Sequence, residues 1–236
     1  MSRRQNLQGL VLRVKPYRET SLMVDVFTRE AGRLTGVKKG YRGKKGQRTI
    51  QPFLLGDMNV SKGDGLLNIY EFEVSENLAP VDQVALGFYV LELVFRALGE
   101  RQVEPRVFDV MLDVLRSLGD HGRVALRVLE RCLLDDLGYG IDFYHAEDSA
   151  GDGCEVVADA VYEYVAGHGF VRTNDTLGRV GLFLTGREIQ EIANEHYSSA
   201  KTAAQARQLY QAALMPLIGE QPLQSRRLLD PERISG

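Results

Sequence analysis

The sequence predicts an α+β protein in which a small barrel of five short strands is followed by a mainly helical domain. Up to residue 74 the sequence contains short stretches whose residues alternate between two faces, whereas from Pro80 onwards the apolar residues recur with the period of a helix. The two parts of the chain also differ in charge. Up to Arg48 there are 13 basic residues and three acids, a net of +10, and after it 16 basic residues and 29 acids, a net of −13. With 236 residues and 44% hydrophobic content, the chain can bury a substantial core.

The N-terminal strands are expected at residues 7–14, 21–28, 32–39, 53–61 and 66–74. The second alternates best, with Leu22, Val24 and Val26 on one face and Met23, Asp25 and Phe27 on the other. The pair Asp64-Gly65 suits a tight hairpin before the fifth strand. Five strands with a basic loop are typical of the OB-fold barrel, which commonly binds oligonucleotides across one sheet face and its flanking loops, although an SH3-like barrel fits the same strand count.

The segment from Arg29 to Arg48 is strongly cationic, with eight basic residues, one acid and five glycines. Such concentration of one sign of charge favours a polyanionic partner over a merely solvated loop. Tyr41 could stack on a base, or pack as a core or hairpin side chain. The residues expected to contact phosphates are Arg33, Lys38, Lys39, Arg42, Lys44, Lys45 and Arg48.

Helical periodicity predicts a central buried helix at 84–98, a second from Pro105 to a stop at Gly119, and a third at 123–137. Short strands are expected at 160–165 and 169–173. A capping box at Thr185–Glu188 begins a helix that reaches about residue 195, and a last helix at 202–214 ends at Pro216 before an extended tail.

These elements suggest four segments. Residues 1–79 form the nucleic-acid-binding barrel, and 80–142 the core of the helical domain. Residues 143–184 form a small lobe, and 185–236 supply C-terminal helices and a tail that pack on the helical domain.

Motifs for catalysis and cofactors are weak. Lys38 stands where a phosphate-binding loop needs glycine, and no Gly-x-Gly lies between a strand and a helix of a parallel unit. His145, Cys154 and His168 lack the paired spacings that preorganise a zinc site. The expectation is therefore a non-enzymatic protein with no metal or cofactor; a metal-dependent nuclease is the enzyme alternative. No apolar run is long enough to span a membrane, so a cytoplasmic location is expected.

Several stretches together resemble the RecO family of bacterial recombination mediators. These are residues 19–28 (ETSLMVDVFT), Gly32-Arg33, 37–40 (VKKG), 51–53 (QPF), 137–143 (LGYGIDF) and 224–227 (QSRR). The resemblance covers nearly the whole chain in the right order. Two features depart from the family pattern: Lys38 replaces a common alanine, and only Cys154 remains where many relatives carry four zinc-binding cysteines, so the small lobe is expected to lack zinc.

The resemblance implies a DNA repair and homologous recombination mediator of the RecF pathway, associated with the bacterial nucleoid. It would bind single- and double-stranded DNA, anneal complementary strands, and with the partner RecR help RecA replace single-strand-binding protein. It also implies a site for the acidic, apolar C-terminal tail of single-strand-binding protein on the helical domain. Arg96, Arg123 and Arg127 are the candidates for that site, unless they pair with nearby acids such as Glu130. An OB-fold RNA-binding protein is the alternative function.

Overall fold

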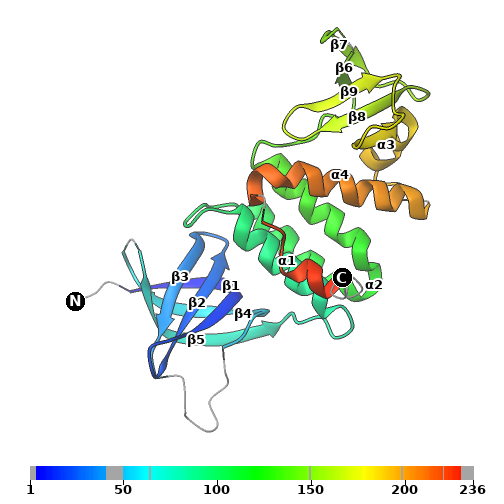
Figure 1. Ribbon diagram of the computed structural model, residues 1–236. Coiled ribbons are helices and arrows are strands. Elements are labelled where there is room, and N and C mark those ends of the chain that lie inside the picture. Colours follow the sequence, from blue (N-terminus) through cyan, green and yellow to red (C-terminus); the bar gives the residue numbers. More distant parts are fainter. Residues whose placement is uncertain are drawn as a thin grey trace. The chain divides into compact units, whose positions relative to one another are not determined.

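A computed structural model describes residues 4–40, 50–63, 65–148, 150–197, 199–219 and 221–229, without the side chains of residues 120, 121, 227 and 229. The chain forms two compact units. Unit 1 comprises Met1–Ala125 and Pro222–Gly236, and unit 2 comprises Leu126–Gln221. The first helix after the barrel and the beginning of the second helix, up to Ala125, therefore belong to the same compact unit as the barrel (Figure 1).

The N-terminal strands close into the expected barrel, with each observed strand within a few residues of its predicted range. The strands are β1 (Arg4–Tyr17), β2 (Ser21–Thr28), β3 (Gly32–Lys38), β4 (Leu54–Ser61) and β5 (Leu67–Asn77). Their order around the barrel is β1-β2-β3-β5-β4, with β1 also paired to β4. Only the β3–β5 pair is parallel among these pairings. The OB-fold is confirmed by this closed arrangement.

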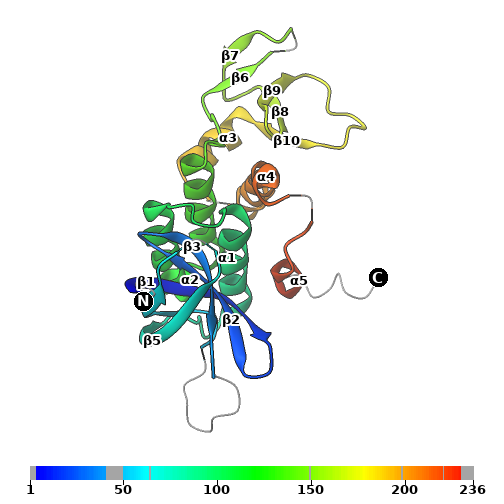
Figure 2. The same cartoon turned by 90° about the vertical axis from the view of Figure 1, so that its left-hand side faces the viewer.

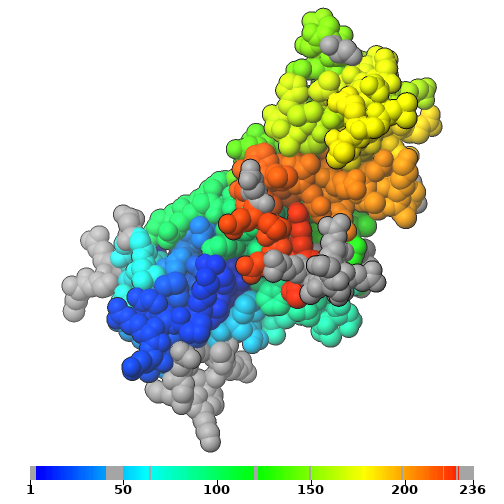
Figure 3. All heavy atoms as spheres, in the orientation of Figure 1, coloured from blue at the N-terminus to red at the C-terminus, as the bar shows by residue number. Residues whose placement is uncertain are grey.

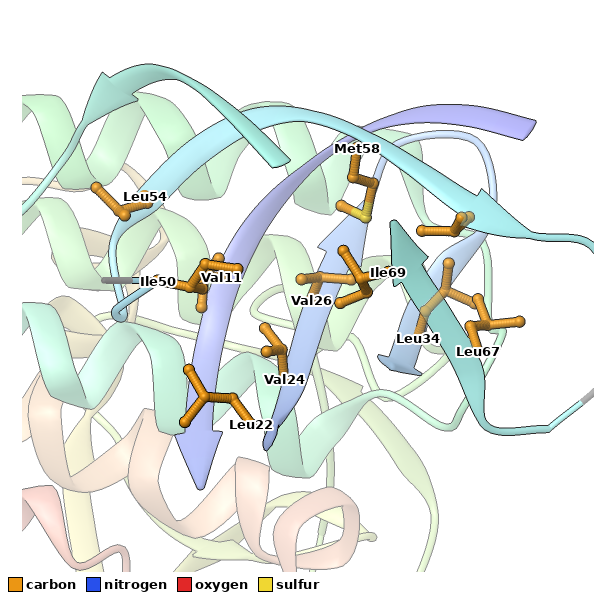
Figure 4. Close-up of a cluster of buried hydrophobic side chains, with 11 residues drawn as sticks. Val11, Leu22, Val24, Val26, Leu34, Ile50, Leu54, Met58, Leu67 and Ile69 are labelled. Atoms are coloured by element: carbon orange, nitrogen blue, oxygen red, sulfur yellow. The ribbon is translucent and has the colours of Figure 1, made fainter. Parts of the chain in front are cut away.

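The barrel interior is filled by branched and long apolar side chains from all five strands (Figure 4). On β2, Leu22, Val24 and Val26 point inward, as the alternation predicts. Met58 and Ile69 enter from β4 and β5. The alternate residues of β2, among them Phe27, therefore lie on the outer face, because successive side chains of a strand point to opposite sides.

Two helices of unit 1 follow the barrel, α1 (Val84–Ala97) and the first part of α2 (Pro105–Asp136). The short helix α5 (Ser225–Leu229) packs on α1 and lies at the surface of unit 1 (red in Figure 3). Its start is held by the Glu92 carboxylate, which accepts hydrogen bonds from the backbone N–H groups of Gln224 at 2.9 Å and Ser225 at 2.8 Å. The expected extended tail is thus wrong for residues 225–229, because a remote carboxylate supplies the cap that the local sequence lacks.

The predicted stop at Gly119 is also wrong. Helix α2 runs through Gly119 and is instead kinked at Gly122, whose φ of 51° and ψ of −125° are non-helical. Gly119 has no strained backbone angle, and nothing lies within 4 Å of the position that its Cβ would take. Glycine three residues later marks the true break because it alone adopts such angles without steric cost.

Unit 2 contains a five-stranded sheet of order β10-β8-β9-β6-β7. Two of its strands, β8 (Val161–Val165) and β9 (Gly169–Thr173), match the predicted ones. The other three are too short to show a clear alternation: β6 (His145–Glu147), β7 (Gly153–Glu155) and β10 (Leu182–Thr185). Helix α3 (Gly186–Ala193) begins with the predicted capping box, in which Thr185 and Glu188 exchange hydrogen bonds.

Helix α4 (Ala200–Ile218) completes unit 2. Pro216 lies inside this helix rather than at its end, so that prediction is wrong by about one turn. The helix ends at Gly219, whose φ of 74° is in the left-handed region.

Candidate nucleic-acid interface

The outer face of β1, β2 and β3 is covered by helices of the same unit. The Phe27 ring of β2 packs edge-on against Phe108 of α2, with ring centroids 5.5 Å apart. The guanidinium of Arg13 lies 3.9 Å from the centroid of the Phe95 ring of α1 and donates to Asp25 at 2.8 Å. The sheet face that many OB-folds offer to oligonucleotides is therefore occupied here by protein.

The outer face of β4 and β5 is acidic. Asp57 on β4 is the register partner of Glu73 on β5, and Glu71 lies two residues earlier on the same outward side. All three are exposed, whereas the intervening Phe72 and Val74 pack against the barrel core. Such a face repels a phosphate backbone.

Several basic residues of the N-terminal region are engaged by the protein itself. Arg29 donates from Nε to Oδ1 and from Nη2 to Oδ2 of Asp109, each at 3.0 Å, and these hydrogen bonds lower the pKa of that carboxyl. Arg4 stacks over Tyr70, 4.3 Å from the ring centroid. Arg13 and Arg29 thus contact the neighbouring helices, and Arg4 contacts another strand of the barrel.

Two of the predicted phosphate-binding residues also contact other parts of the protein. Arg33 donates from Nε to the carbonyl of Leu98 at 3.0 Å, and its guanidinium lies 4.6 Å from the Phe95 ring centroid. Lys38 donates from Nζ to the carbonyl of Tyr70. Partial burial lowers the pKa of the Lys38 ammonium, with nearby Glu71 acting in the opposite direction.

Lys39 is exposed at the end of the barrel where the basic loop begins. The strand register places the β1–β2 turn at this same end, because Tyr17 is opposite Ser21 and Leu22 is opposite Lys38. Figures 1 and 2 show this turn and the end of β3 together at the lower end of the barrel. The remaining predicted contacts, Tyr41, Arg42, Lys44, Lys45 and Arg48, lie outside the described residues.

The turn brings two further cations to this end of the barrel, Lys15 and Arg18, both exposed. Neither was among the predicted contacts, because both stand outside the dense basic run and are separated from it by a whole strand. The sequence did contain a sign of them. The first two predicted strands form a hairpin, and in an antiparallel sheet its turn lies beside the end of the third strand.

The three arginines proposed for a partner tail are in different environments. Arg123 is exposed and Arg96 half-buried, whereas Arg127 is only 7% exposed. Arg127 donates from Nη2 to Glu130 at 2.8 Å, which is the pairing that the sequence analysis held open as the alternative. Val124 and Val128, four residues apart on α2, are exposed at 48% and 41%.

Cys132 is buried and Cys154 is half-buried, and both are free thiols. Within the described ranges, histidine, cysteine and acidic residues form no group of three or more placed to hold a metal ion. Among the helices so described, none combines the length and hydropathy that crossing a membrane requires.

Comparison with known families decides where this chain belongs. Residues 1–78 match the family model "Recombination protein O N terminal", and residues 81–227 match "Recombination protein O C terminal". The chain belongs to the RecO family. Similar proteins are the DNA repair proteins RecO of Haemophilus influenzae strain 86-028NP (35% identical, 94% of each chain covered) and Mannheimia succiniciproducens (36%, covering 92% of this chain and 96% of that one). The RecO protein of Vibrio cholerae strain ATCC 39541 is 34% identical over 92% of this chain and 90% of its own.

The two RecO models meet between residues 78 and 81, directly before α1. The N-terminal model therefore covers the barrel with its basic segment, and the C-terminal model covers the helices and the sheet of unit 2. The resemblance inferred from short motifs is thus confirmed over almost the full length.

Proposed function

We propose that this RecO-family protein binds single- and double-stranded DNA through the basic end of its barrel and anneals complementary strands without nucleotide or metal. Membership of the family supports a role in DNA repair and recombination. The observation that supports the finer proposal is the place of the basic run from Arg29 to Arg48 in the chain, which contains β3 and continues past its end at Lys38, on an OB barrel whose usual binding face is covered. The RNA-binding alternative is not favoured by the family membership.

Annealing follows from contacts to phosphate. Lysine and arginine side chains that neutralise phosphates bind any sequence and release condensed counterions. When two strands are neutralised on one protein their mutual repulsion falls, and base pairing supplies the remaining free energy. No bond is made or broken in this process, so the proposal assigns no enzymatic step to the protein.

The partner proposals follow the family resemblance. With RecR, the protein would help RecA replace single-strand-binding protein on DNA. The acidic, apolar tail of single-strand-binding protein would dock on α2, where exposed Arg123 stands beside exposed Val124. Arg96 and Arg127 remain proposed contacts, but the burial of Arg127 beside Glu130 makes Arg123 the better test.

The decisive experiment measures annealing of two complementary oligonucleotides, bare and then coated with single-strand-binding protein, in chelator and at several salt concentrations. The test variant replaces Lys39, Arg42 and Lys44 with alanine and leaves Lys38 in place, because Lys38 also bonds to the barrel. A charge-matched control replaces the exposed residues Lys62, Arg172 and Arg187.

If the proposal is right, the wild type and the control anneal coated strands, whereas the test variant loses annealing. Its binding to single strands also depends less on salt, with a slope lower by about 0.7 for each lost phosphate contact. Annealing by the test variant at the wild-type rate would remove the basic loop as the DNA site. A wild type that binds RNA more tightly than DNA of the same length, and anneals neither, would restore the RNA-binding alternative.

The tail site is tested with a fluorescent peptide of the single-strand-binding protein C-terminus. Arg123→Ala is expected to weaken peptide binding and to leave binding of a naked oligonucleotide unchanged, because the side chain is exposed and lies outside the barrel. Equal loss of peptide and DNA binding would contradict a separate tail site.

A further inference from the structure

The structure separates the N-terminal cations into those that hold the fold and those that are left exposed. Residues 4–40 contain eight lysines and arginines. Five of them bond to, pair with or stack on barrel and helix groups: Arg4, Arg13, Arg29, Arg33 and Lys38. Among the contacts described for this stretch, Lys15, Lys39 and Arg18 have no acidic partner, and all three are exposed.

These three cations gather at one end of the barrel. Lys15 is opposite Met23 in the β1–β2 register, three positions before Arg18, which is the first residue of the turn. Lys39 directly follows Lys38, which is opposite Leu22 at the start of β2. Two strand pairings therefore bring the turn and the start of the basic loop together, although more than 20 residues separate Arg18 from Lys39 in the chain.

Arg18 is in an unusual conformation for its type. Its φ is 53°, in the left-handed region where a turn would ordinarily carry glycine or asparagine. Its guanidinium lies 5.3 Å from the ring centroid of Tyr17, which positions a cation beside an aromatic ring at the edge of the barrel. Backbone strain of this kind is a reason to ask what the Arg18 side chain binds.

We propose that Lys15 and Arg18 form a second phosphate-binding element, which continues the path of a single DNA strand from Lys39 over the β1–β2 turn. This inference rests on the proposed function and adds residues that lie outside the basic run. The Tyr17 ring provides the stacking surface. Because a base can stack on a protein ring only when it is free of its own neighbours, the element selects single strands over duplex.

The alternative explanation is that these cations bind any anionic surface, such as a lipid membrane. A nucleic-acid strand is favoured because the three cations stand at the ends of β1 and β3 and in the turn, where Glu19 is the one acid among residues 15–20, whereas exposed Glu71 and Glu73 lie on the neighbouring outer face. A flat lipid surface would have to accommodate those two carboxylates as well, whereas a single strand passes only Glu19.

The test measures binding of a fluorescent oligo-dT strand, and of a duplex of the same length, over a series of salt concentrations. The variant is Lys15→Ala with Arg18→Ala, and the matched control is Lys62→Ala with Arg172→Ala, which removes the same charge at other exposed positions. Tyr17→Ala and Tyr17→Phe separate stacking from charge. Urea unfolding of every variant verifies that the barrel remains folded.

We expect the Lys15/Arg18 variant to bind oligo-dT about tenfold more weakly than the control at 0.1 M salt, with a salt slope lower by about 1.4 for two lost contacts. Tyr17→Ala should weaken oligo-dT binding more than duplex binding, and Tyr17→Phe should retain both, since the ring supplies the stacking. A variant that matches its control on oligo-dT overturns the inference and leaves the basic-loop proposal intact, provided the Lys39/Arg42/Lys44 variant still loses binding.

Two other results also decide the question. A wild type that binds neither oligo-dT nor duplex defeats the proposed function itself, and with it this extension. Strong binding of wild type to vesicles of phosphatidylglycerol, abolished in the same variant while oligo-dT binding persists, would assign the turn to a lipid surface instead.

Discussion

The buried pair of Arg127 and Glu130 makes the sharpest stability prediction. Arg127 is 7% exposed and Glu130 is fully buried, and their side chains meet at 2.8 Å. The guanidinium also lies 5.7 Å from the centroid of the Tyr210 ring, where burial raises the pKa of the tyrosine hydroxyl well above its usual range. The surroundings are thus poor in water, and a charge without its partner is costly there.

Replacing Arg127 with alanine leaves the Glu130 carboxylate in this setting without the cation. Removing one member of a buried ion pair costs about 3–5 kcal/mol of folding free energy, a large part of the roughly 5–15 kcal/mol that holds a typical domain together. Exchanging both residues for apolar ones of similar volume, as in Arg127→Met with Glu130→Leu, should recover most of that loss. Arg123→Ala, at an exposed position one turn earlier, should change stability by about 0.5 kcal/mol or less.

Urea unfolding followed by circular dichroism at neutral pH gives the four free energies. A loss below about 1 kcal/mol for Arg127→Ala would refute the view that the pair is desolvated and coupled. A double variant no more stable than the single one would show that lost packing, rather than an unpaired charge, causes the effect. The result bears on function too, because reduced tail-peptide binding by Arg127→Ala is meaningful only at temperatures where the variant is folded.

Three further predictions follow from the backbone and the surface pairs. Gly119→Ala should stabilise the protein by about 0.5–1 kcal/mol in urea unfolding, because the site is helical and open, whereas Gly122→Ala should destabilise it because of its positive φ; equal effects would contradict the kink. Thr185→Ala should cost about 1 kcal/mol by removing the cap of α3, and Thr185→Ser should cost much less; matching losses would point to packing instead. The pKa of Asp109 is lowered by Arg29, so the pair contributes stability above the carboxyl's ordinary value near 3.8 and loses it as the pH falls through the lower folded value. Unfolding measured between pH 6 and pH 2 should therefore show a smaller acid-induced loss in Asp109→Asn than in wild type, and parallel curves would rule the pair out.

The sequence alone determined the strands of the barrel and their inner face. Alternation in residues 22–26 can bury only one set of side chains, so strand type and core face followed from a local pattern, whereas the strand register and the choice between an OB and an SH3-like barrel did not. The concentration of cations before Arg48 and the short motifs were equally local, and they identified the kind of partner and the family. The capping box at Thr185 followed from four adjacent residues.

Only the tertiary structure decided which cations hold the fold and which remain exposed. In the sequence Arg33 and Lys38 are basic residues like Lys39, but they donate to the carbonyls of Leu98, directly after α1, and of Tyr70 in β5. The partners of these bonds lie 65 and 32 residues away, a separation that no local pattern encodes. Packing of a helix on the barrel also covers the outer face of β2. Strand pairing places the turn that contains Arg18 at the same end of the barrel as Lys39, because pairing joins residues that are far apart in the chain.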